Sequence, residues 1–134
     1  MASILRVNTL TDASSNNSTA MSTINQGTAK AWINFNGAAT GSVSDYDRDS
    51  FNISVTIDNG TGDYTLTATS AMSNDDYAGI VTGDADGVAD FCVACTGDNS
   101  TARTTTVIRA RTANTGGSPK DSVTISVLIF GDLA

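Results

Sequence analysis

Strict alternation of apolar and small polar residues over residues 51–57 constrains this chain more than any other feature. Phe51, Ile53, Val55 and Ile57 are separated by asparagine, serine and threonine. Successive side chains of a strand point to opposite faces, so the pattern predicts a half-buried antiparallel strand with its apolar face in the core. Residues 58–63 then supply glycines and an asparagine suited to the positive φ of a tight turn, and the alternation resumes over residues 64–68. Together the two segments predict a β-hairpin.

The same two-residue period recurs along the chain. Further strands are predicted at about residues 3–10, 29–36, 77–82, 88–94, 104–111 and 122–130, with Gly, Asn, Asp or Ser clusters between them. Glu, Lys and Gln, the usual residues of exposed helix surfaces, are nearly absent, which also favours strands and turns. Eight strands at hairpin spacing predict an all-β fold: an antiparallel β-sandwich or jelly-roll-like domain with a short N-terminal strand arm.

Composition excludes several classes of function. The chain has 14 acidic residues, all aspartate, 7 basic residues and no histidine, for a formal charge of -7. This sign disfavours nonspecific nucleic-acid binding and anionic membranes, and no apolar run approaches the roughly 18 residues of a membrane span, so we expect a soluble protein made in the cytosol. Without His or Glu, most acid–base and zinc chemistry lacks its usual carriers. We therefore expect neither an enzyme nor a cofactor, although an aspartate-pair glycosidase remains formally possible.

The N-terminal segment differs in composition from the rest of the chain. Residues 11–28 are almost entirely small and polar, which predicts a linker that cannot form a core layer. The short apolar segment before it would have unpaired edges unless it adds to a partner's sheet. We therefore divide the chain into an anchoring arm with its polar linker (residues 1–27) and a β-sandwich trimerisation domain (residues 28–134). The residues predicted to anchor the arm on a particle are Ile4, Leu5, Val7 and Leu10.

Two strands carry more apolar surface than one core face needs. Trp32 and Phe35 lie on opposite faces of their strand, so one is expected in the core and the other against a second sheet or a neighbouring subunit. The apolar/polar alternation also breaks down at residues 128–130, which are all apolar, so both faces of that end of the strand must be covered by other residues. Arg109 and Arg111 share one strand face; they either pair with nearby aspartates or cross a subunit boundary to aspartates of another copy. The predicted oligomer interface comprises Trp32, Phe35, Arg109, Arg111, Leu128 and Phe130.

Two motifs could carry metal or redox chemistry, and each has an ordinary structural explanation. Aspartates are closely spaced at positions 45, 47 and 49 and again at Asp84, Asp86 and Asp90. Such spacing could supply the several carboxylate oxygens that bind a calcium ion. Both series lack the glycine and glutamate of an EF-hand loop, so solvated acidic loops are the preferred interpretation, with calcium at Asp84, Asp86 and Asp90 as the alternative. Cys92 and Cys95 have the C-x-x-C spacing inside a predicted strand, which favours free thiols over a disulfide or zinc site.

Four stretches of the sequence resemble blocks of a known family. Residues 29–37, Ala-Lys-Ala-Trp-Ile-Asn-Phe-Asn-Gly, resemble the A-K-A-W-V-N-F-N-G motif of many bacteriophage tail-fibre and related virion structural proteins, especially those of marine phages. Residues 49–54 and 56–66 resemble that family's D-S-F-N-V-S and D-N-G-T-G-D-Y-T blocks. Residues 71–78 resemble its A-M-P-N-x-x-Y-A block, with Ser73 where proline is common. The resemblance covers about residues 28–134, and it implies a β-rich virion module that typically forms homotrimers and is not an enzyme.

These observations predict a phage virion structural protein, a tail or head fibre-like component located in the virion after synthesis in the host cytoplasm. Its partners would be two further copies of itself and a capsid or tail protein bound through the arm. One alternative is a capsid decoration protein. The other is a glycan-binding receptor-recognition module, for which a host surface glycan would be the partner; sparse aromatic residues make a carbohydrate cleft hard to build.

Overall fold

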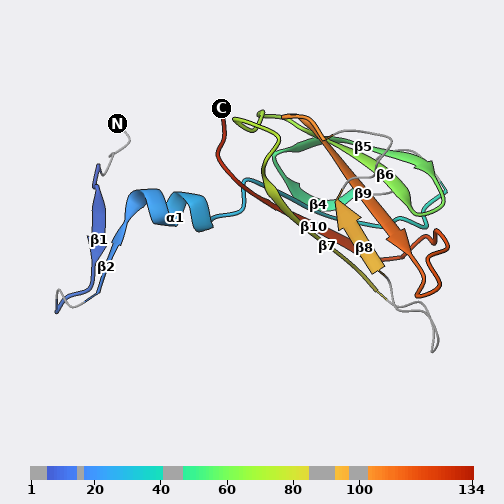
Figure 1. Ribbon diagram of the computed structural model, residues 1–134, viewed down its shortest axis with the longest axis horizontal. Coiled ribbons are helices and arrows are strands. Elements are labelled where there is room, and N and C mark those ends of the chain that lie inside the picture. The colour runs from blue at the N-terminus through green and yellow to red at the C-terminus, as the bar shows by residue number, and fades with distance from the viewer. Residues whose placement is uncertain (1–5, 15–16, 41–46, 85–92, 97–102) are drawn as a thin grey trace.

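The computed structural model describes residues 6–14, 17–40, 47–84, 93–96 and 103–134. A small N-terminal unit stands to one side of a two-sheet body, to which a single chain segment joins it (Figure 1). The body is an antiparallel β-sandwich, which confirms the predicted fold class; a jelly roll in particular is not established by the strand order.

The N-terminal unit consists of a two-stranded hairpin and a short helix. Strand β1 (Thr9–Thr11) pairs with β2 (Ser18–Ala20), and helix α1 (Met21–Gly27) follows directly. The first sheet of the body has the order β4-β3-β10-β7 and the second has the order β5-β6-β9-β8. Their bounds are β3 Ala31–Phe35, β4 Asp47–Phe51, β5 Ile53–Gly60, β6 Asp63–Ala68, β7 Ala78–Gly83, β8 Val93–Thr96, β9 Val107–Ala113 and β10 Ile125–Phe130.

Alternate residues of four central strands build the core between the sheets. Burial alternates without a break along β3, β6, β9 and β10, as the two-residue sequence period predicts. Met72 and Tyr77 close one end of this core. The strand contributions are Ala31, Ile33 and Phe35 from β3, Tyr64 and Leu66 from β6, Ile108 and Ala110 from β9, and Ile125, Val127 and Ile129 from β10.

Tyr64 joins the two sheets at the end of this core that lies beside the β5–β6 turn. Its ring meets that of Phe35 edge to face, with centroids 5.0 Å apart, and burial raises the pKa of its hydroxyl far above the ordinary value. The hydroxyl lies 3.0 Å from the carbonyl oxygen of Gly37 and 2.9 Å from Asp121 Oδ1. A Cβ at Gly37 would collide with the Tyr64 ring and Ile125. The first motif block therefore ends in glycine because a buried tyrosine of a later block packs against its backbone.

Strand β5 departs from the prediction drawn from its own alternation. Ile57, expected in the core, is 46% exposed, whereas Thr56 is 1% exposed. The cause is a register irregularity: Ile53 pairs with Ala68 but Val55 pairs with Thr67, which leaves Ser54 as an extra residue. Such a bulge reverses the facing of every residue after it. The predicted hairpin itself is confirmed, with Gly62 at φ 66° in the turn between β5 and β6.

Three elements fall where the sequence predicted other structure. Residues 11–28, expected to be a linker, contribute to β1 and contain β2 and α1, although none of these elements buries a residue. Strand β4 was not predicted because its Asp-Arg-Asp-Ser-Phe sequence carries only one apolar residue. It is an edge strand paired only with β3, and an edge strand can carry charged side chains because one of its sides is open to solvent.

Replacing Thr56 by valine should raise the free energy of unfolding by about 1 kcal/mol and the melting temperature by about 4 °C. Valine keeps the shape of threonine but removes a buried hydroxyl oxygen that has no hydrogen-bond partner. Thr112→Val is the matched control, since Thr112 is equally buried and its hydroxyl donates to the Lys120 carbonyl at 2.6 Å. Urea unfolding should show Thr112→Val to be destabilised; a Thr56→Val protein no more stable than its parent would contradict the account of β5.

Candidate interaction surfaces

The arm, defined as the described residues 6–14 and 17–27, has exposed apolar side chains and no core. Val7 is 37% and Leu10 is 47% exposed, and every residue of β1 and β2 is exposed. Ile4 and Leu5, also predicted to anchor the arm, lie outside the described residues. The prediction of a lone strand with unpaired edges is wrong, since β1 pairs with β2 in register from Thr9–Ala20 to Thr11–Ser18. An isolated two-stranded hairpin is marginally stable in water, so this unit needs further contacts to hold its shape.

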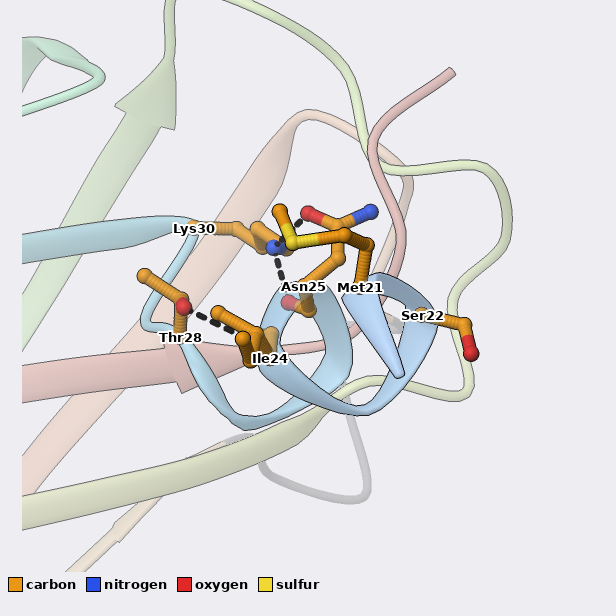
Figure 2. A pocket seen from close by; sticks show the side chains of 6 residues that line it. All are labelled: Met21, Ser22, Ile24, Asn25, Thr28 and Lys30. Carbon is orange, nitrogen blue, oxygen red and sulfur yellow. Dashed lines mark hydrogen bonds between the residues drawn. The ribbon is translucent and has the colours of Figure 1, made fainter. Parts of the chain in front are cut away.

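Lys30 holds the arm against the sandwich. Figure 2 shows its ammonium group directed at Asn25, where it donates to the backbone carbonyl oxygen and, at 2.7 Å, to Oδ1. The Lys30 residue is 6% exposed. Helix α1 has no side-chain cap at its N-terminus and no acidic residue in its first turn. Two hydrogen bonds from one buried lysine are therefore a main support of a helix that is weak by itself.

A hollow of about 460 Å³ lies between α1 and the start of β3. Its lining comes from one helix face and from Lys30 (Figure 2). Met21 and Ile24, spaced three residues apart, supply its apolar part, and Thr28 closes the end of the helix by donating to the Ile24 carbonyl at 2.6 Å. Sequence analysis missed this feature because α1 is too short to show a helical period.

The described outer face of the β5-β6-β9-β8 sheet carries charged and polar side chains together with Ile57, which is 46% exposed. Arg109 and Arg111 alternate with buried residues of β9 and point outward, as predicted. The guanidinium of Arg109 makes a two-pronged ion pair with the carboxylate of Asp63 in the adjacent strand β6. Of the two alternatives given for Arg109, the described chain shows the first, a pair with a nearby aspartate, and its role at an interface stays a prediction. For Arg111 the interface role stays a prediction.

The outer face of the β4-β3-β10-β7 sheet carries a continuous line of apolar side chains. Cross-strand pairing places Phe51 beside Trp32, Trp32 beside Leu128 and Leu128 beside Ile80. Directly opposed residues of antiparallel strands have Cβ atoms about 5 Å apart, so these side chains are neighbours. Phe51 and Ile80, at the two ends, are 52% and 51% exposed. We call these four residues the outer row: Phe51, Trp32, Leu128 and Ile80.

The outer row corrects part of the predicted oligomer interface. Phe35 is fully buried between the sheets, so its assignment to an interface is wrong, while Trp32 occupies the opposite, outward face of β3. Leu128 and Phe130 are half-buried on the outward side of β10, opposite the buried Val127 and Ile129. Phe51 and Ile80 were missed because the sequence does not reveal which strands are neighbours, and Phe51 was expected in the core.

The predicted calcium residues are only partly within the described chain. Asp86 and Asp90 lie outside it, as do Asp45 and Cys92. The carboxylate of Asp84 accepts hydrogen bonds from the hydroxyl of Ser122 and, at 3.0 Å, from the backbone N–H of Thr124. Among the residues that are placed, no group of three or more His, Cys, Asp or Glu side chains could hold a metal ion. Through these two hydrogen bonds Asp84 connects the end of β7 to the segment that precedes β10.

Comparison with protein-family models, with curated proteins and with solved structures finds no match for the chain. None of the described helices is long and apolar enough to cross a membrane. The interpretation of the arm, the hollow and the outer row therefore depends on their physical chemistry and on the sequence blocks described above.

Lys30→Met should detach α1 from the sandwich without unfolding the β-sheets, because methionine keeps an apolar stem but cannot donate to Asn25. Amide hydrogen exchange in residues 21–27 should accelerate at least about tenfold while exchange in β3 and β10 stays unchanged. Lys120→Met serves as the control, because Lys120 lies beside Thr112 and the β5–β6 turn. Unchanged protection of α1 in Lys30→Met would contradict the role assigned to Lys30.

Ser122→Ala should raise the pKa of Asp84. The Ser122 hydroxyl is the largest cause that holds this pKa below its usual value, because it hydrogen-bonds the ionised form. A depressed folded-state pKa contributes stability above the unfolded-state value, near 3.9, and that stability is lost as the pH falls through the folded-state pKa. NMR titration of the Asp84 carboxyl carbon should show the rise, with Ser126→Ala as the control; an unshifted midpoint would contradict this assignment.

Proposed function

We propose that the chain is a structural component of a bacteriophage particle, a tail or head fibre-like protein that attaches through its N-terminal arm and presents a trimeric β domain. The observation that carries the proposal is the division of the described chain into an arm without a core and a sandwich with its own core. A protein built for attachment needs such a division, because the docking segment must stay available while the rest is already folded.

The arm has the chemistry of a docking element. Its large apolar side chains are exposed on a hairpin that is marginal by itself, and Lys30 fixes the adjacent helix to the body, which orients the hairpin away from it (Figure 1). Burial of Val7 and Leu10 against a capsid or tail protein would stabilise both the hairpin and the complex. Docking on a capsid or tail protein would place the chain in the virion.

The family resemblance supports the proposal through the fold. The motif blocks supply Ala31, Ile33 and Phe35, Tyr64 and Leu66, and Met72 and Tyr77, all of which are buried. These blocks therefore describe how a sandwich of this kind is packed, and a shared sandwich is what a family of virion modules would retain. We propose no catalytic activity, since the chain has no histidine or glutamate.

The capsid decoration protein is retained as the second candidate, because a decoration protein would use the same arm. The glycan-binding module has less support: Tyr64 and Tyr77, two aromatics that could stack on a sugar, are 0% and 3% exposed. The position of the chain on the particle separates a fibre from a decoration protein.

Labelled antibody against the chain should bind purified particles at a fixed position, at the tail or on head vertices for a fibre and across the head for a decoration protein. Leu10→Asp should reduce incorporation at least about tenfold, because a charge replaces an apolar anchor. Thr9→Asp adds the same charge to the other face of β1 and is the matched control. Purified particles without the chain would contradict the proposed function.

A further inference from the structure

The dipeptide Asn-Gly occurs at residues 36–37 and again at residues 59–60, and the fold holds these two places very differently. Asparagine is one of the chemically labile residues of proteins. A glycine after it has no side chain to shield its backbone nitrogen. That nitrogen can attack Cγ of the asparagine side chain and close a five-membered succinimide ring. The rate of this reaction depends on how freely the two groups can meet.

At Asn36 the surrounding fold restrains both reacting groups. Gly37 is buried, and its N–H donates to the carbonyl oxygen of Ser122 at 2.9 Å. Asn36 Oδ1 accepts a hydrogen bond from the N–H of Ala38 at 3.1 Å. The Tyr64 side chain packs directly against Gly37 and leaves no room for a Cβ there. Ring closure at Asn36 therefore requires this end of the core to open first.

At Asn59 the same dipeptide lies at the exposed end of β5. Asn59 and Gly60 are both exposed, and a Cβ on Gly60 would meet no atom within 4 Å. The pairing of β5 with β6 shifts register between Asp58 and Gly60, which leaves Asn59 as an extra residue. An extra residue of this kind is left out of the hydrogen-bonded ladder. The ring can therefore close at Asn59 without any opening of the core.

Two further side chains contact the reacting groups of Asn59 and Gly60. The N–H of Gly60, whose nitrogen is the attacking atom, donates to the carboxylate of Asp58 at 2.8 Å. The side-chain nitrogen of Asn59, which must leave, donates to the hydroxyl of Thr65 at 2.9 Å. A carboxylate within hydrogen-bond reach of a nitrogen that must lose its proton meets the geometric requirement for a general base.

We propose that Asn59 is a site of spontaneous modification, at which the chain converts its own asparagine into aspartate and isoaspartate. Asp58 takes the proton from the Gly60 nitrogen as that nitrogen bonds to Asn59 Cγ. The bond between Cγ and Nδ2 then breaks, and the side-chain nitrogen takes up the proton and leaves as ammonia. Water opens the succinimide at either of its two carbonyl carbons. One opening gives aspartate, and the other gives isoaspartate, whose backbone runs through the former side chain.

The product changes the β5–β6 turn in two ways. Each chain gains one negative charge, which takes the formal charge from -7 to -8, and the new carboxylate adjoins Gly60, the residue paired with Asp63. A carboxylate has no N–H, so the hydrogen bond that Asn59 donates to Thr65 is lost. The inference uses no residue of the arm, so it stands or falls independently of the proposed function.

The two dipeptides supply the first test, because Asn36 is the internal control for Asn59. Folded full-length protein is incubated in mildly alkaline buffer, and peptide mapping by mass spectrometry follows the gain of about 1 Da that accompanies loss of ammonia and uptake of water. Asn59 should convert at least about tenfold faster than Asn36, with isoaspartate among its products. The difference should disappear in denaturing urea. An unmodified Asn59, equal rates in the folded protein, or a difference that persists in urea would overturn the inference.

The second test concerns the base. Asp58→Ser keeps an oxygen that can accept from the Gly60 N–H but removes the carboxylate. Conversion of Asn59 should slow at least about tenfold in this variant. Asp75→Ser, at an exposed aspartate in the segment before β7, is the matched control and should convert at the parent rate. Circular dichroism establishes that both variants are folded. Equal rates in the two variants would overturn the role assigned to Asp58.

Discussion

The contact of Tyr64 with Phe35 and Gly37 is the interaction on which the rest of the structure depends. It joins the two sheets beside the β5–β6 turn, and the tyrosine hydroxyl links the carbonyl that follows β3 to Asp121 ahead of β10. Asp121 also accepts a hydrogen bond at 2.6 Å from the backbone N–H of Gly62, so the β5–β6 turn is fixed by the same carboxylate. One polar cluster at the end of the core thus sets the position of the hairpin, of β3 and of β10. The outer row inherits its geometry from this arrangement, because Trp32 and Leu128 occupy the reverse side of those two strands.

The sequence predicted elements well where one local rule operated along a whole strand. In β3, β6 and β10 the buried and half-buried residues alternate from end to end, so the two-residue period identified each strand, and in β6 and β10 its core face as well. The same rule misassigned Ile57, since a single extra residue at Ser54 reverses the facing and leaves no mark in the pattern of residue types. Strand β4 and helix α1 were missed because β4 is an edge strand with a polar sequence, and α1 has only 7 residues, no side-chain cap and no acidic residue in its first turn.

The candidate surfaces were predicted in part. Trp32, Leu128 and Phe130 were predicted to be oligomer-interface residues, and they lie on the outward side of their strands. Phe35 was assigned there as well, since spacing shows that two residues face opposite ways but not which of them faces the core. Phe51 and Ile80 could not be found, because a line of side chains across a sheet depends on strand order. Strand order is set by long-range pairing, which a single sequence does not display.

The outer row runs perpendicular to the strands, so it exists only when the whole first sheet has folded. Its four residues come from positions 32, 51, 80 and 128, and they become neighbours only after three separate strand pairings have reached their final registers. A chain with one slipped or missing strand displays no continuous row. The complete row is therefore present only on chains whose first sheet has formed with all of its strands in register.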